Sequence, residues 1–192
     1  MEASKPSARK RLLNAAAKLF YNNGINSTGI DSITEEAGVA KMSLYNNFSS
    51  KAELVEAYIT ERHHEWLDLY HRRVDEAKNP IERVLAVFDA YADHAEFEYE
   101  RGFRGCGILN AAAEFPAGDP ARIAVKRHKE EVESILKKHL EDLFLVNAEE
   151  QCQLAEHLSF ILEGAMARAG LEGKSNRVSN AKNIARSILK TL

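Results

Sequence analysis

Apolar and polar positions in the first part of the chain alternate with the period of an α-helix. Between residues 7 and 23 apolar side chains recur every three or four positions, and basic side chains are interspersed among them. The apolar positions are Leu12, Leu13, Ala16, Leu19 and Phe20. The pattern predicts an amphipathic helix that ends at Asn22-Asn23-Gly24, because glycine readily adopts the left-handed conformation that closes a helix.

Two shorter helices are expected next. Asp31 is a candidate N-cap for a helix that runs to Ala37. Gly38 interrupts the pattern, and residues 42–48 form a second short helix. A serine pair then precedes a much longer helix that starts at residue 51. Two short helices around a tight glycine turn are typical of a helix-turn-helix motif.

The rest of the chain carries further helical patterns. The helix from residue 51 is expected to reach about residue 78, because proline at position 80 cannot continue it. Pro80 and Pro120 each open another helix, the first ending near Gly102 and the second extending through Leu143. A glycine-rich segment and a compact alanine-rich helix lie between them, at 101–115, and two final helices are expected at about 148–169 and 175–192.

Composition supports a mostly helical, globular protein. Ten Gly and four Pro in 192 residues leave little room for the many turns of a β-sandwich or barrel. Apolar residues make up 45% and charged residues 29% of the chain, as is usual for soluble domains. The apolar runs are short, and the N-terminus lacks the apolar segment of a signal peptide. We therefore expect an all-α protein of the cytoplasm that has no membrane partner.

Charge is distributed unevenly along the chain. Residues 1–51 hold seven Lys or Arg against four Asp or Glu, a net charge of +3, whereas residues 52–192 carry a net charge of −6. A basic first part followed by an acidic remainder indicates that the first part meets a polyanion. Ordinary variation of surface charge is the alternative explanation.

The predicted helix-turn-helix resembles the N-terminal domain of TetR-type transcriptional repressors. The resemblance covers about residues 8–60 without gaps, and it rests on Ala16, Leu19-Phe20, Gly24, Thr28, Ile33, Ala37-Gly38-Val39, Ser43-Leu44-Tyr45, Phe48 and Lys51-Ala52-Glu53-Leu54. It implies a three-helix DNA-binding domain at residues 1–50 and a helical domain for ligand sensing and dimerisation at residues 51–192. For the second domain the resemblance is one of length and helical pattern only.

The resemblance also implies which residues meet DNA. In the family the second helix of the motif enters the major groove, which here is the helix at residues 41–48. Side chains suited to base edges, thymine methyl groups or phosphates are Lys41, Met42, Ser43, Tyr45, Asn46 and Asn47. Thr28 and Lys51 match family positions that touch the DNA backbone, and Gly29, where the wider motif begins, is grouped with them. Ala40 stands where many relatives have a capping Ser, so the reading helix is expected to lack a side-chain cap.

Three basic residues of the first helix, Arg9, Lys10 and Arg11, have two interpretations. They either attract DNA phosphates or form a solvated basic face.

The segment around Cys106 is the strongest candidate for a sensor. Cys106 is expected at the N-terminus of the alanine-rich helix with Arg101 and Arg104 nearby in sequence, which favours a thiolate. Its spacing to Asn110 and Glu114 resembles that of a subset of TetR-type regulators, some of which respond to electrophiles or oxidants through a cysteine at this place. The alternative is a small buried side chain of the core.

A pocket for an unknown small-molecule inducer is expected near this cysteine. Its candidate residues are Phe88, Tyr91, His94, Phe103, Cys106 and Asn110, with Phe97 also turned inward. The alternative is an ordinary core, which an inward aromatic cluster forms more often than a ligand cage. Cys152 is assigned to packing. The seven histidines lack the spacing of metal ligands, so neither a metal site nor a cofactor is expected.

Apolar stripes on the two final helices, with small residues at 164–167, match the pair through which the family forms homodimers, so residues 148–192 are the expected dimer interface. An intrachain bundle is the alternative.

Taken with the resemblance, the sequence predicts a homodimeric TetR-type repressor and not an enzyme. It would leave a palindromic DNA operator when a small molecule or modification of Cys106 reshapes the second domain and shifts the helix at 51–78. The alternative is a small helical enzyme or carrier whose basic N-terminus is incidental. No Ser-His-Asp order, phosphate-binding glycine loop or paired-carboxylate motif supports catalysis.

Overall fold

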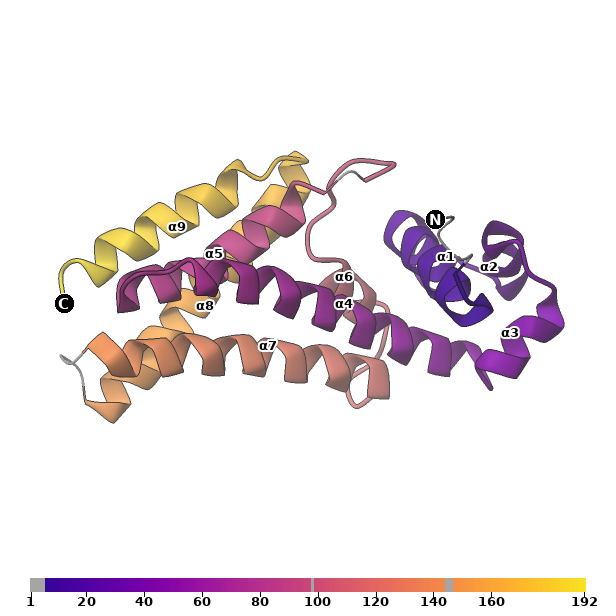
Figure 1. Ribbon diagram of the computed structural model, residues 1–192, viewed down its shortest axis with the longest axis horizontal. Helices are drawn as coiled ribbons and strands as arrows, with labels where there is room; N and C mark the ends of the chain where they lie inside the picture. The colour runs from indigo at the N-terminus through magenta and orange to yellow at the C-terminus, as the bar shows by residue number, and fades with distance from the viewer. Residues whose placement is uncertain (1–5, 98, 144–146) are drawn as a thin grey trace, which may run out of the picture. The chain divides into compact units, whose positions relative to one another are not determined.

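The computed structural model describes residues 6–97, 99–143 and 147–192, and all regular elements in these ranges are helical (Figure 1). The helices are α1 (Ala8–Asn23), α2 (Ile30–Ala37), α3 (Lys41–Asn47), α4 (Lys51–Asp75), α5 (Pro80–Ala95), α6 (Gly107–Ala112), α7 (Pro120–Leu140), the 3-10 turn η1 (Glu141–Leu143), α8 (Ala148–Glu172) and α9 (Asn176–Leu189). The predicted all-α fold is confirmed. Residues 1–5, most of the N-terminal stretch on which the absence of a signal peptide was predicted, lie outside the described residues.

The helices form two compact units. The first unit comprises residues 1–62 and 107–125, and the second comprises residues 63–106 and 126–192. Helices α4 and α7 each contribute residues to both. The units therefore divide the chain at other positions than the boundary expected at residue 50, because α6 and the chain that follows it pack with the N-terminal helices. The assignment of DNA binding and sensing to two domains stays a prediction.

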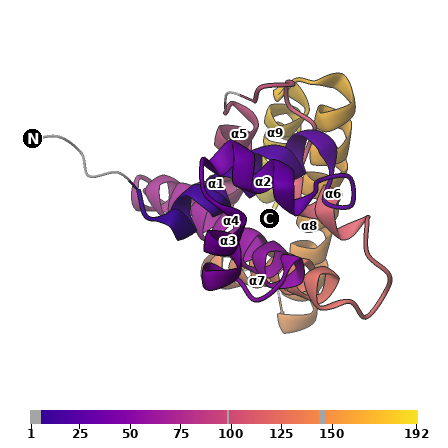
Figure 2. The ribbon, with the colours of Figure 1, turned by 90° about the vertical axis from the view of Figure 1, so that its right-hand side faces the viewer.

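A small apolar core holds the first unit together. Helices α1, α2 and α3 contact one another, and the first part of α4 belongs to the same unit (Figure 2). The fully buried side chains are Leu12, Ala16, Ile33, Leu44, Phe48 and Leu54. Phe20 of α1 and Tyr58 of α4 meet edge to face with ring centroids 5.4 Å apart. The short helices α2 and α3 are thus held by only a few buried side chains.

Several helix ends differ from those predicted. The N-cap of α2 is Gly29 and not Asp31, which lies in the first turn where its charge suits the positive end of the helix. Helix α4 ends at Asp75 instead of residue 78. Helix α5 ends at Ala95, well before Gly102, because Tyr99 folds back and its hydroxyl donates to the His94 carbonyl at 2.9 Å.

Two predicted helix-turn-helix features are confirmed. Gly38, which follows α2, has the left-handed φ of +59° that glycine adopts without strain. Ala40 precedes α3 without a side-chain cap.

The second unit is built around α5. Helix α9 packs on both α5 and α8, and these three lie side by side in Figure 1. Their buried positions include Val84, Val87 and Phe88 of α5, Leu158, Leu162 and Met166 of α8, and Val178, Ala181 and Ala185 of α9. Within the described ranges no helix combines the length and the apolar character needed to cross a membrane.

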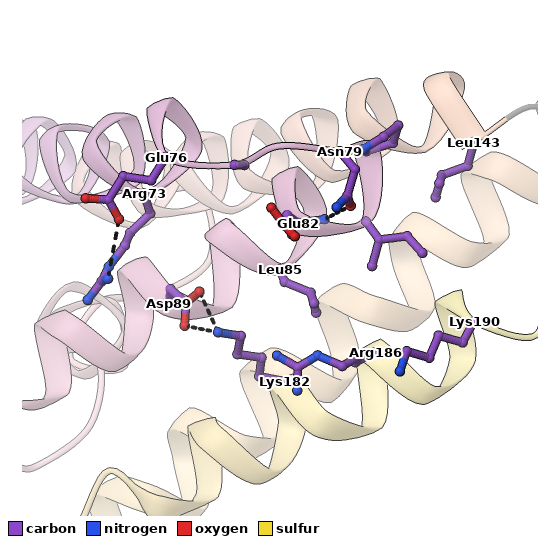
Figure 3. Close-up of a pocket in the computed structure, with 13 residues that line it drawn as sticks. Arg73, Glu76, Asn79, Glu82, Leu85, Asp89, Leu143, Lys182, Arg186 and Lys190 are labelled. Atoms are coloured by element: carbon purple, nitrogen blue, oxygen red, sulfur yellow. Dashed lines mark hydrogen bonds and ion pairs between the residues drawn. The ribbon is translucent and has the colours of Figure 1, made fainter.

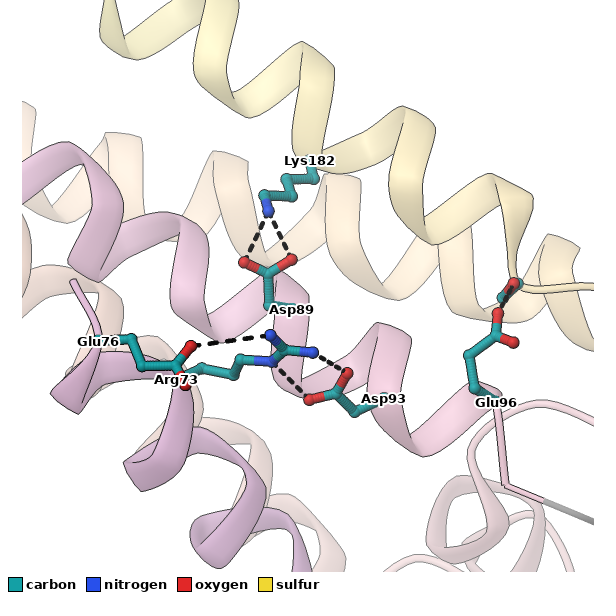
Figure 4. Close-up of polar contacts among 7 residues, drawn as sticks. Arg73, Glu76, Asp89, Asp93, Glu96 and Lys182 are labelled. Atoms are coloured by element: carbon teal, nitrogen blue, oxygen red, sulfur yellow. Dashed lines mark hydrogen bonds and ion pairs between the residues drawn. The ribbon is translucent and has the colours of Figure 1, made fainter.

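Ion pairs join the helices of this unit at its surface (Figure 4). The Arg73 guanidinium, on α4, donates through Nε to Asp93 Oδ2 of α5 at 2.7 Å. One turn earlier on α5, Asp89 accepts two hydrogen bonds from Lys182 Nζ of α9, through Oδ1 at 2.5 Å and Oδ2 at 2.6 Å. These two pairs fix α4 and α9 on neighbouring positions of α5.

Gly170 permits a close approach between α8 and the segment before α6. A Cβ atom at Gly170 would lie 2.6 Å from Gly105 N, 2.7 Å from Gly105 Cα and 2.8 Å from Arg104 C. These are backbone atoms, which cannot swing away as a flexible side chain can. Gly105 itself has a φ of +85°, so both glycines are required at this crossing.

We expect Gly170→Ala to lower the free energy of unfolding by about 1–3 kcal/mol, since the added methyl group overpacks the crossing. Lys138→Ala, at an exposed position of α7 outside the expected dimer interface, is the control and should change this free energy by less than about 0.5 kcal/mol. Urea denaturation at two protein concentrations measures both and separates any effect on association. Equal stability of the two variants would contradict the packing argument.

Candidate DNA-binding surface and sensor core

Helix α3 buries one face and leaves the other exposed. Leu44 within it and Phe48 at its C-cap are 0% and 1% exposed, and they anchor the helix in the core of the first unit. Met42 and Tyr45, on the outer face, are 70% and 48% exposed. Lys41 and Asn46 are also exposed. Large apolar side chains gathered in water on so short a helix mark a surface that meets a partner.

The polar residues of α3 are engaged to different degrees. Lys41 Nζ lies 2.7 Å from Asp31 Oδ1, and the hydrogen bond and charge of Asp31 raise the pKa of Lys41. Both side chains are largely exposed, so the pair is easily exchanged for another partner. Asn47 Nδ2 donates to the Ser43 carbonyl at 2.7 Å and thereby helps to close the helix. Of the predicted reading residues, Lys41, Met42, Tyr45 and Asn46 therefore point outward, while Ser43 and Asn47 are half-buried.

Two residues that were predicted to contact the DNA backbone, Thr28 and Lys51, make hydrogen bonds to the loop between α1 and α2. Thr28 is buried, and its hydroxyl donates to the Gly24 carbonyl at 2.6 Å. Lys51 Nζ donates to the Ile25 carbonyl at 2.6 Å, and burial lowers the pKa of this lysine while Glu114 opposes the shift. Gly29 is exposed at the N-cap of α2. Thr28 and Gly29 lie at the start of the motif and Lys51 follows it as the first residue of α4, and the contact of all three with DNA stays a prediction.

Glu114, which follows α6, holds the same loop from the other side. Its carboxylate accepts the backbone N–H of Ile25 and of Asn26, both at 2.7 Å. Gly24 makes room for it: its φ is +88°, and a Cβ there would lie 2.9 Å from Glu114 Oε1. Sequence reasoning missed this role, because the partners are 89 and 88 residues apart in the chain.

The three basic residues in the first turn of α1 all have partners within the first unit. Arg11 donates to the carbonyls of Ala37 and Gly38 at 3.2 and 3.0 Å and so ties α1 to the turn of the motif. The Arg9 guanidinium lies 4.8 Å from the centroid of the Phe48 ring, and Lys10 pairs with Glu61. A structural role explains Arg11 without any DNA phosphate.

The structure gathers only part of the predicted sensor residues. Phe88, Tyr91, Phe103 and Cys106 are buried in the second unit. His94 is half-buried beside Phe97 and Tyr99, with ring centroids 5.3 and 6.2 Å away. Asn110 is exposed on α6, which belongs to the first unit.

Two packing predictions are wrong. Phe97 is 43% exposed instead of turned inward, because α5 has ended two residues before it. Cys152 is exposed on the first turns of α8, where its sulfur interacts with Lys137.

Lys129 of α7 is a half-buried cation that the sequence analysis overlooked. Its Nζ lies 2.7 Å from Glu163 Oε1, 3.2 Å from the Tyr91 hydroxyl and 3.7 Å from Cys106 Sγ. Burial opposes its charge, but the neighbouring Cys106, Tyr91 and Glu163 raise the pKa of Lys129 well above its ordinary value. Burial also raises the pKa of Tyr91. A signal was present in the sequence, because Lys129 lies four residues after Val125 and three before Val132 on the buried stripe of α7.

Two histidines far apart in sequence meet in the same unit. His63 Nδ1 and His128 Nδ1 are 2.8 Å apart, and the His128 ring lies edge-on to Trp66 at 5.4 Å. His128 is buried, and burial with the charge of Lys129 lowers its pKa to about 3. Across the described ranges no three His, Cys, Asp or Glu side chains are arranged to hold a metal ion.

Comparison with known proteins agrees with the geometry of α1 to α4. Residues 12–58 match the family model described as bacterial regulatory proteins, tetR family. A solved TetR-family transcriptional regulator from Streptomyces coelicolor is 29% identical and superposes with a TM-score of 0.85 over 96% of this chain and 95% of that one. Residues 12–58 therefore carry the DNA-binding region of TetR-type regulators, and the chain as a whole is similar to a solved member of that family.

Curated proteins that are similar to this chain include named transcriptional regulators. The transcriptional repressor KstR2 of Mycolicibacterium smegmatis is 32% identical over 98 residues, which are 50% of this chain and 47% of that protein. The chain thus spans about half the length of that relative. The regulator YxaF of Bacillus subtilis is 26% identical over 85% of both chains.

His128 should make the stability of the protein depend on pH. Its pKa is about 3 when folded and about 6.5 when unfolded, so between these values the unfolded chain binds more protons. Stability from this group is complete above pH 6.5 and is lost as the pH falls toward 3, with a slope of up to about 1.4 kcal/mol per pH unit. We expect His128→Asn to flatten the dependence of the unfolding free energy on pH between about 4 and 6.

The exposed His64, changed to Asn, is the matched control and should leave the slope as it is. Chemical denaturation over this pH range measures all three proteins. An unchanged slope in His128→Asn would show that His128 is not neutral in the folded state.

Proposed function

We propose that this chain is a TetR-type transcriptional repressor, and not an enzyme, whose helix α3 reads a palindromic DNA operator. The observation that carries the proposal is the exposed face of α3, with Met42 and Tyr45 turned to solvent while Leu44 and Phe48 fix the helix. KstR2, a repressor by name, supports the direction of regulation. A protein in this role acts in the cytoplasm with the DNA.

The exposed side chains suit the chemistry of a major groove. The Asn46 amide can pair with both polar atoms of an adenine edge, and the Met42 side chain can contact a thymine methyl group. The Tyr45 hydroxyl and the Lys41 ammonium suit phosphate oxygens. Lys41 forms an exposed ion pair with Asp31, and such a pair contributes little free energy. Breaking it to contact DNA therefore costs little.

Selection of random duplex DNA at about 150 mM salt tests the proposal, and we expect a palindrome to be enriched. Tyr45→Ala should weaken binding to that operator about tenfold or more, and Asn46→Ala should relax specificity at one base pair. Asn14→Ala, an exposed amide of α1, is the control and should bind normally. Absence of any enriched sequence would contradict the proposal, and substrate turnover that survives deletion of residues 1–50 would favour the helical-enzyme alternative.

We further infer that an unidentified small molecule releases the operator by acting on the second unit. Support comes from two buried polar atoms near Lys129, Trp66 Nε1 and Glu163 Oε2, which have no hydrogen-bond partner among the described residues. Unpaired buried polar atoms are costly, and a ligand can satisfy them. Helix α4 is the proposed carrier of the signal, since it is one helix with residues in both units.

Modification of Cys106 is a second route to release. An adduct on the sulfur would displace Lys129 Nζ, which lies 3.7 Å away and also holds Glu163. Burial of Cys106, at 8% exposure, limits access to small reagents. N-ethylmaleimide should then release the operator from the wild type and from Cys152→Ser, but not from Cys106→Ser. Release from all three proteins would exclude this route.

A homodimer through residues 148–192 is the proposed assembly. Phe160, Gly164, Ala167 and Leu171 follow one another along one exposed face of α8, with Phe160 and Leu171 at 64% and 89% exposure. Ile184 of α9 adds a further exposed apolar side chain at 52%. A dimer also doubles the short DNA readout of α3 across two half-sites.

Phe160→Glu combined with Leu171→Glu should convert the dimer into a monomer, because four charges would meet in one apolar interface. Light scattering after size-exclusion chromatography should give a mass near 21.5 kDa for this variant and about twice that mass for the wild type. Ile123→Glu, an exposed apolar residue of α7, is the control and should remain dimeric. A monomeric wild type would contradict the proposed interface.

A further inference from the structure

A groove with a volume of about 620 Å³ lies in the second unit, apart from the predicted sensor residues (Figure 3). It is formed by the C-terminal end of α4, the first turns of α5, Leu143 and one face of α9. This volume is in the range of small-molecule sites. No residue of the proposed inducer pocket lines it.

One wall of the groove is cationic. Lys182, Arg186 and Lys190 follow one another at intervals of four residues along α9, so they share a helix face, and Figure 3 shows them in a row beside α5. Ile184, on the proposed dimer face, lies two residues from Lys182 and therefore on the opposite side of α9. The proposed dimer would leave the groove open.

Two of these cations have no acidic partner among the residues that the structure describes. Lys182 is neutralised by Asp89, at 2.5 and 2.6 Å. Arg186 donates to a neutral group, Asn183 Oδ1, at 2.7 Å, and within the described ranges no carboxylate contacts the Lys190 ammonium. The outer end of the α9 face therefore presents two positive charges to the groove.

The acidic residues of the groove contact groups other than Arg186 and Lys190. Glu82 accepts the backbone N–H of Lys78 at 2.7 Å, and this bond lowers its pKa. Glu76 is 75% exposed and lies 4.0 Å from Arg73 Nη1. Arg73 is in turn held by Asp93 through the bidentate contact of Figure 4. In the described part of the chain, none of these carboxylates contacts Arg186 or Lys190.

The opposite wall is apolar. Ile81 and Leu85 of α5 lie one turn apart, and Leu143 continues the surface. Figure 3 shows Leu85 and Leu143 on the side of the groove that faces the cations of α9. A ligand that fits must therefore combine a negative charge with an apolar body.

We propose that this groove binds an amphipathic carboxylate, an organic acid with an aliphatic or aromatic body. Its carboxylate lies against Arg186 and Lys190, and its body covers Ile81, Leu85 and Leu143. The arginine fork matches a carboxylate with two parallel hydrogen bonds, and the lysine adds a third donor with positive charge. Burial of the apolar body excludes water from the groove and adds affinity in proportion to the area covered.

Octanoate is the probe, and the full-length protein is titrated with it while backbone amide resonances are followed by NMR. Octanoate should shift the resonances of residues 81–85 and 183–190 in a saturable manner. Octanol, which lacks the charge, and acetate, which lacks the apolar body, should each bind about tenfold more weakly or worse. This readout needs no DNA, so its outcome is independent of the proposed repressor function.

Arg186→Gln combined with Lys190→Gln should raise the dissociation constant for octanoate about tenfold or more. Lys126→Gln combined with Arg127→Gln removes the same charge from exposed positions of α7 outside the groove and should leave the constant unchanged. The proposal is overturned if octanoate fails to saturate these resonances, if octanol binds equally well, or if both double variants bind like the wild type.

Discussion

Burial of Leu44 and Phe48 is the interaction on which the DNA-reading surface depends. Helix α3 has only seven residues and begins without a side-chain cap, so it has little stability of its own. The core of the first unit supplies what is missing, and the same two anchors turn Met42 and Tyr45 to solvent. Core packing and surface presentation are therefore one property of this helix.

Polar contacts around the loop between α1 and α2 extend this constraint. Lys51 holds the Ile25 carbonyl, and Glu114 holds the N–H groups of Ile25 and Asn26, so both backbone polarities of the loop are satisfied. Arg11 does the same for the carbonyls that end α2. These charged side chains hold the backbone of the motif in place.

The second unit separates its charges into two environments. The half-buried pair of Lys129 and Glu163 lies against the buried Tyr91 and Cys106, so a change at any one of them affects the others. At the surface, Asp89 neutralises one of the three cations that face the groove on α9 and leaves two. The cluster around Lys129 thus suits a response to perturbation, and the groove suits recognition of an anion.

The sequence by itself determined the all-α class, the helix-turn-helix and the helix starts at Pro80 and Pro120. These features depend on neighbours three or four residues away, which periodicity and capping report directly. Only the tertiary structure decided the pairings of Glu114 with Ile25, His63 with His128 and Lys182 with Asp89, which are 89, 65 and 93 residues apart. It also decided that Phe97 and Cys152 are exposed. Burial depends on which helices cover a position, and local sequence patterns do not show this.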